Sequence, residues 1–360
     1  MPACSHLLGA AAALLCLSAS CAKNPNTTVL NEWPMLMVHD AATTYLREGD
    51  LLNKTVLDWT ITQPQGIGTA GELDCGARGF DWRPSLVGGK LVMHHGSVTI
   101  NYPMGAAVDS IVAWAANNTA PSDLVVLGVT DCDGTGCDQA VQKLLAQRQI
   151  KFVSDCSDLK GLTVGEARKK YELPTGGFVM ALVNPCGWEE NYVPANACSG
   201  TGHTEGGDVV GDATAGDDAA LVYKCYADSR TKAFPVNRMM DYLGKIGATP
   251  ASAGGQLSTA QALWEETAAS VVIGVADVTA PPPCCAATAP PPNIAHHAQS
   301  VRMPARMQGS SLLLDESRSQ LNKLLTARVK ANAWEHVNFI EINNVCNGGP
   351  ELWQALQQLP

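Results

Sequence analysis

After its first 22 residues, the sequence lacks any apolar run that reaches the roughly 18–20 residues needed to cross a bilayer. It also lacks an excess of positive charge, because 24 Lys and Arg stand against 34 Asp and Glu, a net charge of −10. This balance argues against nucleic-acid binding and against a broad basic surface for anionic membranes. No CxxC pair recurs at the spacing of zinc ligands. We therefore expect a globular chain with no nucleic-acid partner, no transmembrane segment and no structural zinc.

The first 22 residues have the pattern of a secretory signal peptide. An apolar core at 7–17 is followed by small residues suited to cleavage, although no Lys or Arg precedes the core. The alternative is a buried amino-terminal helix. The carboxyl end is too short and too polar for a GPI signal. We expect a secreted, extracellular protein, and Asn26, Asn53 and Asn117 begin sequons at which it could be glycosylated.

The cysteines agree with an exported chain. Three of the 13 lie within the first 22 residues, which leaves ten, an even number that favours disulfides. Cys132 with Cys137, and Cys186 with Cys198, could each close a small loop. The adjacent cysteines at 284–285 are expected to pair with two distant partners rather than with each other. We therefore predict a mature protein whose cysteines are mostly oxidised.

Short apolar segments alternate with helix-like ones along the remaining chain. Strands are expected at 35–38, 77–82, 90–94, 124–129, 177–183, 220–225, 270–275 and 337–342. Helices are expected at 104–117, 138–148, 163–170, 236–245, 258–267, 311–330 and 350–357. The strands are apolar on both faces, which is typical of a parallel sheet covered by helices. This alternation predicts an α/β fold, a TIM-type (β/α)8 barrel with functional residues at the carboxyl ends of its strands. A doubly wound open sheet is the alternative.

Two stretches interrupt the alternation. Residues 198–219 are rich in Gly, Asp, Thr and Ala, and residues 276–300 contain two Pro-Pro-Pro runs. Both have the composition of long loops. Helix and strand patterns resume after each stretch, so we expect a single domain over 23–360 with two loop insertions.

Ionisable residues end or follow three of the apolar runs in the first third of the chain. His39 and Asp40 follow the first run, Asp81 and Arg83 end the second, and His95 ends the third. Histidine can give or take a proton near neutral pH, and a fixed guanidinium stabilises negative charge that develops at phosphorus. These are the groups needed for in-line phosphoryl transfer with general acid–base catalysis.

The three motifs are Met-Leu-Met-Val-His-Asp at 35–40, Gly-Ala-Arg-Gly-Phe-Asp-Trp-Arg at 76–83 and Lys-Leu-Val-Met-His-His-Gly at 90–96. In this order they resemble the X-domain of phosphatidylinositol-specific phospholipase C, in the PLC-like phosphodiesterase superfamily. The resemblance is strongest over 35–130. It implies a distorted or incomplete barrel. It also implies cleavage of phosphatidylinositol-type lipids or glycolipid anchors at a membrane surface, with a cyclic inositol phosphate as a product.

The resemblance also implies a role for each residue. His39 matches the general base that takes the proton of the inositol 2-hydroxyl, and His95 matches the general acid that protonates the leaving oxygen. Asp40 matches the carboxylate that supports this acid, and Arg83 matches the guanidinium that neutralises the phosphate. Asp81 lies on the same strand face as Arg83, so it is expected to orient Arg83 or to contact the substrate. His94 is expected to be a structural neighbour.

The second motif separates two subclasses of the family. Calcium-dependent relatives carry Glu-x-Asp as metal ligands on this strand, and Asn follows their first histidine. Here Asp81 and Arg83 occupy the matching positions, and Asp40 follows His39. The Arg83 guanidinium, in place of a metal-binding carboxylate, would repel Ca²⁺ and would itself supply much of the positive charge that Ca²⁺ provides. The resemblance therefore implies the metal-independent, bacterial-type pattern, and we expect neither a metal nor a cofactor.

One residue departs from that pattern. The base histidine of bacterial-type enzymes is held by an aspartate on the last strand, whereas this chain has Asn343 at the matching position. Asparagine can orient an imidazole but cannot compensate its charge. Glu341, on the same strand face, is the candidate to compensate. Two alternatives stay open: a metal-dependent phosphodiesterase of the glycerophosphodiester or sphingomyelinase D kind, and a non-catalytic binding protein on the same barrel.

Overall fold

The structure of the protein is a computed structural model. It describes residues 23–47, 60–96, 98–153, 155–183, 209–211 and 221–227, much of 240–263, and 312–360. The expected signal peptide, the expected strand 270–275, the expected loop 276–300 and most of the expected loop 198–219 lie outside the described residues. The expected Cys186–Cys198 pair and the cysteines at 284–285 also lie outside them. The boundary of the single domain at 23–360 stays a prediction.

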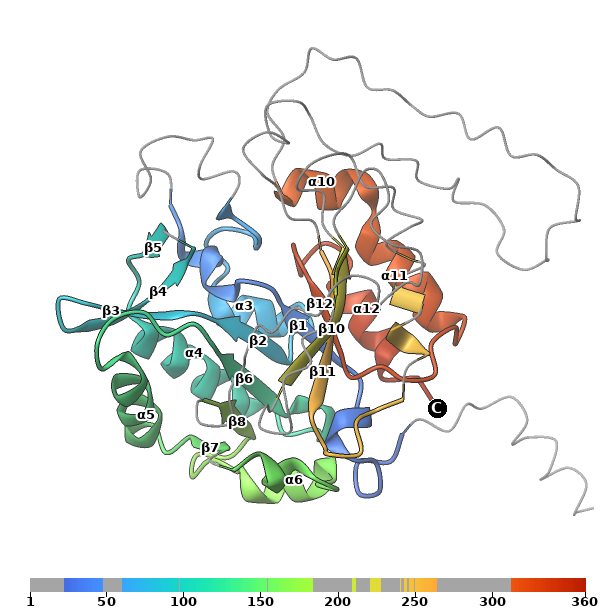
Figure 1. Cartoon of the computed structure of the whole chain (residues 1–360), viewed down its shortest axis with the longest axis horizontal. Helices are drawn as coiled ribbons and strands as arrows, with labels where there is room; N and C mark the ends of the chain where they lie inside the picture. Colours follow the sequence, from blue (N-terminus) through green and yellow to red (C-terminus); the bar gives the residue numbers. More distant parts are fainter. Residues whose placement is uncertain are drawn as a thin grey trace, which may run out of the picture.

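A mostly parallel sheet of nine strands forms the centre of the molecule (Figure 1). The strands are β1 (Met35–Val38), β2 (Gly79–Trp82), β6 (Val125–Val129), β7 (Lys151–Val153), β8 (Val179–Leu182), β9 (Val209–Gly211), β10 (Leu221–Ala227), β11 (Leu257–Ala262) and β12 (Phe339–Ile342). Their spatial order is β7-β8-β6-β2-β1-β12-β11-β10-β9, and only β9 pairs antiparallel with its neighbour. Among the described strands, β7 and β9 are the two edges. The predicted α/β class with a mostly parallel sheet is therefore confirmed, and the strands that the structure describes do not close into a ring.

The strand β1 shows how the sheet is covered on both faces. All four of its residues are buried, because alternate side chains enter two different cores. Met35 and Met37 pack with Phe339 in one core. Leu36 and Val38 pack in the other, which includes the apolar faces of the outer helices. Buried residues on both faces explain why these strands could be recognised from continuous apolar runs.

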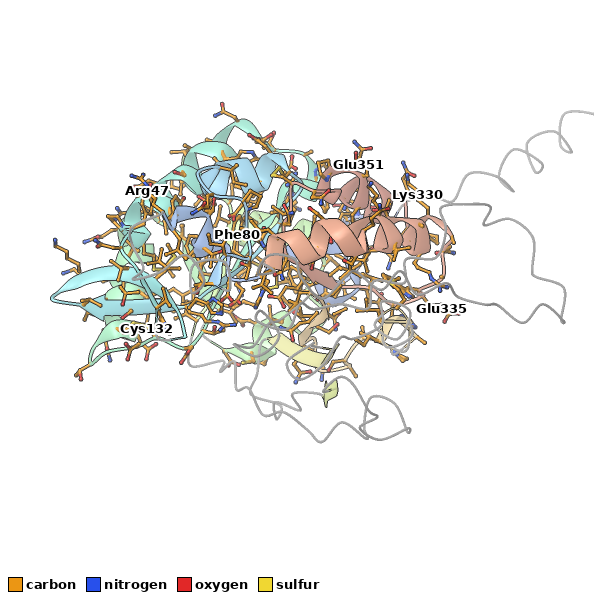
Figure 2. All side chains as sticks on the ribbon, turned by 90° about the horizontal axis from the view of Figure 1, so that it is seen from above. Arg47, Phe80, Cys132, Lys330, Glu335 and Glu351 are labelled. Carbon is orange, nitrogen blue, oxygen red and sulfur yellow. A yellow bond between two sulfur atoms is a disulfide. The ribbon has the colours of Figure 1, made fainter. Side chains whose placement is uncertain are left out.

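The helices lie outside the sheet (Figure 1). They are α3 (Gly68–Asp74), α4 (Met104–Asn117), α5 (Cys137–Gln147), α6 (Val164–Lys170), α10 (Leu312–Ser319), α11 (Leu321–Lys330) and α12 (Gly349–Leu356), with 3-10 turns η1 (Leu30–Glu32), η2 (Ala41–Tyr45), η3 (Pro121–Asp123) and η4 (Cys156–Leu159). Local sequence sets several ends. For example, Thr163 and Glu166 form a capping box that begins α6. In Figure 2, Phe80 lies within the interior, whereas Lys330 and Glu351 belong to exposed helix positions.

A second, antiparallel sheet begins directly after β2. It contains β3 (Pro84–Val87), β4 (Lys90–His95) and β5 (Val98–Ile100). Gly88 and Gly89, with φ of 55° and 78°, form the two-residue turn between β3 and β4, a conformation that glycine adopts without strain. The predicted strand 90–94 is thus present, but its assignment to the barrel was wrong. It lies beside the end of β2, where the His94 amide donates to the Arg83 carbonyl (2.8 Å).

Two other predictions need correction. Residues 258–267 were expected to be helical, but 257–262 form β11, which pairs with β10 and β12. Ala and Gln favour helices locally, and the sheet partners on both sides override that preference. The expected helix 311–330 is divided into α10 and α11 at Gln320, which has a positive φ of 52°. The short helix α3 was not predicted.

Two disulfides have both of their cysteines within the described residues, and Cys156 is also disulfide-bonded. Cys132 pairs with Cys137, as the spacing predicted, and closes a loop with a sequence separation of 5. Cys75, directly after α3, pairs with Cys346, in the turn between β12 and α12, over a separation of 271. The second bond therefore ties the first third of the chain to its last strand and helix.

We expect the long-range disulfide to contribute more stability than the short one. In the loop-entropy model, loss of the Cys75–Cys346 bond costs about 5.6 kcal/mol and loss of the Cys132–Cys137 bond about 2 kcal/mol. Double alanine variants at each pair, unfolded in denaturant, measure both values. The Cys132→Ala/Cys137→Ala variant is the matched control. Equal losses would contradict the entropic account.

Candidate active site

His39 and Asp40 follow β1 directly at its carboxyl end. The backbone N–H of His39 donates to the carbonyl of Ile342 (3.2 Å), which continues the pairing of β1 with β12. Asp40 has φ 42° and ψ 49°, a left-handed conformation that is uncommon for a residue with a side chain. The chain turns there and enters η2. Such local strain is often concentrated at functional positions.

The carboxylate of Asp40 is shared by three basic side chains. Its Oδ2 atom lies 3.2 Å from Nε2 of His39 and 3.0 Å from Nε2 of His95, and its Oδ1 atom lies 3.4 Å from Nε of Arg83. The carboxylate is only 2% exposed. Burial alone would raise the pKa of Asp40, but Arg83 and the two imidazoles outweigh burial and hold this pKa well below its usual range. Asp40 is therefore the anionic centre that brings the two histidines together.

His95 is the most accessible member of this cluster, because its side chain is 25% exposed. Its Nδ1 atom lies 3.2 Å from the carbonyl oxygen of Thr60, and its Nε2 atom faces Asp40. Both ring nitrogens thus face oxygen atoms. The ring centroid lies 6.3 Å from that of His39, at 76°. Thr60 belongs to a segment that no sequence motif had singled out.

Asp81 and Arg83 lie at the end of β2, on the strand face predicted from alternation. The Arg83 guanidinium donates to Oδ2 of Asp81 (3.2 Å), and the same oxygen accepts from the backbone N–H of Asp40 (3.4 Å). Asp81 is buried, while the Arg83 side chain keeps 18% of its surface exposed. Asp81 therefore fixes the guanidinium beside Asp40, with part of it open to a ligand.

Asn343 and Glu341 come from the end of β12. Oδ1 of Asn343 lies 2.9 Å from Nδ1 of His39, with both side chains buried. Glu341 accepts a hydrogen bond from Gln261 Nε2 (2.8 Å). Burial raises the pKa of Glu341 to about 8, against opposing effects of His39 and of the Gln261 hydrogen bond. The group is therefore mostly neutral at pH 7. Gln261 was missed because its segment had been expected to be a helix.

His94 has a structural place beside the cluster. Its Nδ1 atom lies 2.9 Å from the carbonyl of Gly96, and its Nε2 atom lies 2.8 Å from the carbonyl of Asp131. These contacts join the β4–β5 turn to the loop after β6. They occupy both ring nitrogens, so His94 holds the backbone that carries His95.

The cluster has some features of a metal site. Ligand atoms of His39, Asp40 and Asp81 all lie within 4.8 Å of one another. However, the Arg83 guanidinium lies within 3.4 Å of Asp40 and 3.2 Å of Asp81, so both carboxylates already face a cation. A divalent ion between them would meet electrostatic repulsion from Arg83.

A separate cavity of about 490 Å³ lies between η2, the start of α3 and Tyr102. None of the cluster's side chains lines it. Among its lining groups, the Tyr45 hydroxyl bonds to Thr69 (3.1 Å) and the Ser110 hydroxyl donates to a helix carbonyl. The titratable groups that can carry chemistry lie in the cluster, so we place the candidate active site there.

Comparison with solved structures identifies the fold. Phosphatidylinositol-specific phospholipase C of Staphylococcus aureus matches with a TM-score of 0.54 and 11% identity, over 94% of this chain and 95% of that one. The Listeria monocytogenes phosphatidylinositol-specific phospholipase C matches with a TM-score of 0.51 and 11% identity, over 94% and 97% of the two chains. The chain has a PI-PLC-like fold. No family model and no curated protein matches its sequence.

A mutant form of the same S. aureus enzyme gives a similar match. An F249X mutant of the S. aureus enzyme matches with a TM-score of 0.52 and 12% identity, over 91% and 94% of the two chains. Within the described residues, no helix is long and apolar enough to cross a membrane.

The buried Glu341 should make stability fall with rising pH. Its pKa is raised from an ordinary value of 4.5 to about 8. The contribution of neutral Glu341 to the free energy of unfolding is therefore fully present below pH 4.5 and is lost as the pH rises through 8. Glu341→Gln should reduce the fall in Tm between pH 5 and pH 8 by on the order of 5–10 °C. Calorimetry at both pH values checks this result, with the exposed Glu351→Gln as control. An unchanged fall would contradict it.

Proposed function

We propose that the protein is a secreted phosphodiesterase that cleaves phosphatidylinositol-type lipids or glycolipid anchors. The observation that carries the proposal is the shared Asp40 carboxylate, with His39 and His95 on one oxygen and Arg83 on the other. The similarity of fold to bacterial phosphatidylinositol-specific phospholipases C supports it. The proposed export of the chain rests on its first 22 residues and its cysteines.

The proposed reaction begins with His39 as general base. Asn343 accepts a hydrogen bond from Nδ1–H of His39, so the lone pair of the neutral ring lies on Nε2. Nε2 takes the proton of the inositol 2-hydroxyl, whose oxygen then attacks phosphorus. His39 and Asp40 lie in contact, so the developing imidazolium forms beside a carboxylate. This contact supplies charge compensation that Asn343 does not supply.

The leaving oxygen needs a proton as its bond to phosphorus breaks. His95 is the proposed donor, because it is partly exposed and Asp40 stabilises its protonated form. A new P–O bond to the inositol oxygen replaces the P–O bond to glycerol, and the products are a cyclic inositol phosphate and a diacylglycerol. His39 ends with one additional proton and His95 with one fewer, and exchange with solvent restores both.

Negative charge on the non-bridging phosphate oxygens requires a fixed cation. Arg83 is proposed for this role, because Asp81 and Asp40 hold it in place and part of its surface is open. A preorganised cation lowers the barrier because it needs no reorientation during the reaction. The same contacts make the metal-dependent phosphodiesterase the weaker proposal. Because the net charge is −10, we propose that the protein meets its lipid through a local surface rather than a basic face.

A non-catalytic binding protein is the second candidate function. The observation that favours it is Asn343, a neutral residue at the acceptor position of the proposed base. A protein of this kind would bind inositol phosphodiesters without cleaving them. Binding without turnover, measured on the same purified protein, distinguishes the two functions.

Arg83 should be needed for turnover, and a divalent ion should not. Purified full-length protein should cleave phosphatidylinositol in vesicles in the presence of EDTA. Arg83→Ala should lower turnover by roughly 10²–10³, comparable to loss of one oxyanion-hole donor. Arg148→Ala, at a surface ion pair with Asp109, is the matched control and should leave turnover unchanged. Activity that disappears in EDTA and returns with Ca²⁺ or Mg²⁺ would support the metal-dependent alternative.

An aspartate at position 343 should strengthen the proposed base. It would add negative charge 2.9 Å from Nδ1 of His39, where the present residue offers only a neutral oxygen. Asn343→Asp should raise turnover roughly tenfold, which is about 1.4 kcal/mol of barrier. The control is Asn347→Asp, whose side chain bonds to Ser317 at the surface. If turnover does not rise and Glu341→Gln lowers it strongly, Glu341 rather than the residue at position 343 supports His39.

A further inference from the structure

The side chain of Gln63 joins the ends of the two strands that precede His39 and Asn343. Its Nε2 atom donates to the carbonyl of His39 (3.1 Å) and to the carbonyl of Ile342 (3.0 Å). Its Oε1 atom accepts from the backbone N–H of Val345 (3.0 Å). The side chain is fully buried. Three backbone groups, from the ends of two strands far apart in the sequence and the turns that follow them, therefore meet on one amide.

These three groups lie where the ladder between β1 and β12 ends. The paired residues run as far as Val38 and Ile342, and the His39 amide adds one more bond to the Ile342 carbonyl. Beyond that point the strands separate. The carbonyls of His39 and Ile342 also accept from the Thr62 hydroxyl and the His39 N–H, so Gln63 adds a second donor to each, and it is the acceptor for the Val345 N–H. The Gln63 side chain thereby links the backbone of the two segments just beyond the last paired residues of β1 and β12.

The backbone of Gln63 is itself held in place. Its N–H donates to Oγ1 of Thr43 (3.2 Å), and the neighbouring Thr62 hydroxyl donates to the His39 carbonyl (2.9 Å). The Thr62 carbonyl accepts from the backbone N–H of Asn344 (2.7 Å). The segment is thus attached both to the turn after β1 and to the turn after β12. Gln63 is a rigid bridge rather than a mobile side chain.

We propose that Gln63 is a positioning residue that sets the distance and direction between His39 and Asn343. It acts through the backbone: the groups that it binds belong to His39 itself and to the residues on either side of Asn343, and the hydrogen bond between the two side chains spans the same gap (2.9 Å). The catalytic part of this inference rests on the proposed function. The geometric part does not.

The geometric part can be tested by NMR on the folded full-length protein. The His39 Nδ1–H, buried and bonded to Asn343, should give a slowly exchanging downfield resonance, which His39→Gln identifies by removing it. Gln63→Met removes all three bonds and should broaden or abolish this resonance. Gln65→Met is the control, because Gln65 lies in the same segment and donates only to the Leu46 carbonyl (2.8 Å). A resonance unchanged in Gln63→Met would overturn the proposal.

Gln63→Glu provides a second variant if Gln63→Met does not fold. Its side chain has the same shape and can still accept from Val345, but a carboxyl group has at most one proton to donate, so it cannot donate to the carbonyl oxygens of both His39 and Ile342 as the Gln63 amide does. The same loss of the His39 resonance is expected at pH 7. Retention of the resonance in this folded variant would overturn the proposal equally.

The catalytic part needs a double-mutant cycle on phosphatidylinositol turnover. Gln63→Met should lower kcat by roughly 10–100-fold with little change in KM, because small misplacements of catalytic groups are costly. In an Asn343→Ala background the same substitution should lower kcat less than about threefold, since both act on one contact. Additive losses would contradict the positioning role. If the wild-type protein shows no turnover, the proposed function fails. The His39 resonance alone then tests whether Gln63 positions His39 against Asn343.

Discussion

A single buried carboxylate organises the candidate active site. Asp40 is almost completely removed from solvent, so its negative charge needs compensation, and three basic side chains lie against it: His39, His95 and Arg83. Removal of one member of a buried charged pair typically costs about 3–5 kcal/mol, because the other charge stays behind. Loss of any one of these side chains is therefore expected to destabilise the others. The requirement to compensate Asp40 places two imidazoles and a guanidinium, from β1, β4 and β2, around one point.

The residues that reach the site from β11 and β12 add little further charge. Glu341 is kept mostly neutral by burial, and Gln261 donates to it. Asn343 orients His39 without placing another carboxyl near Asp81 and Glu341. The neutral residue at position 343 is thus consistent with an interior that already contains three carboxyl groups. Asp40, in contact with His39, is the group that can compensate the charge that His39 gains as a base.

Much of the central sheet could be predicted from the sequence, because β1, β2, β6 and β12 are mainly apolar and buried on both faces, and ionisable residues lie at the ends of β1 and β2. The candidate residues could be named for the same reason. Which strands pair with one another could not be predicted from local sequence. The strand that carries His95 belongs to a separate sheet, and β11 has helix-forming residues that only its neighbours hold extended. Gln261 and Gln63 escaped notice because their role depends on strands distant in sequence.

The most direct test of this account follows phosphatidylinositol cleavage by ³¹P NMR, with EDTA present, for wild-type protein and for Asp40→Asn. The account predicts that the wild type forms a cyclic inositol phosphate. It predicts that Asp40→Asn, which keeps the shape but removes the shared charge, slows this step by about 100-fold or more, a barrier increase of roughly 2.7 kcal/mol. A wild type that forms no cyclic phosphate, or an Asp40→Asn variant that forms it at the wild-type rate, would contradict the central claim.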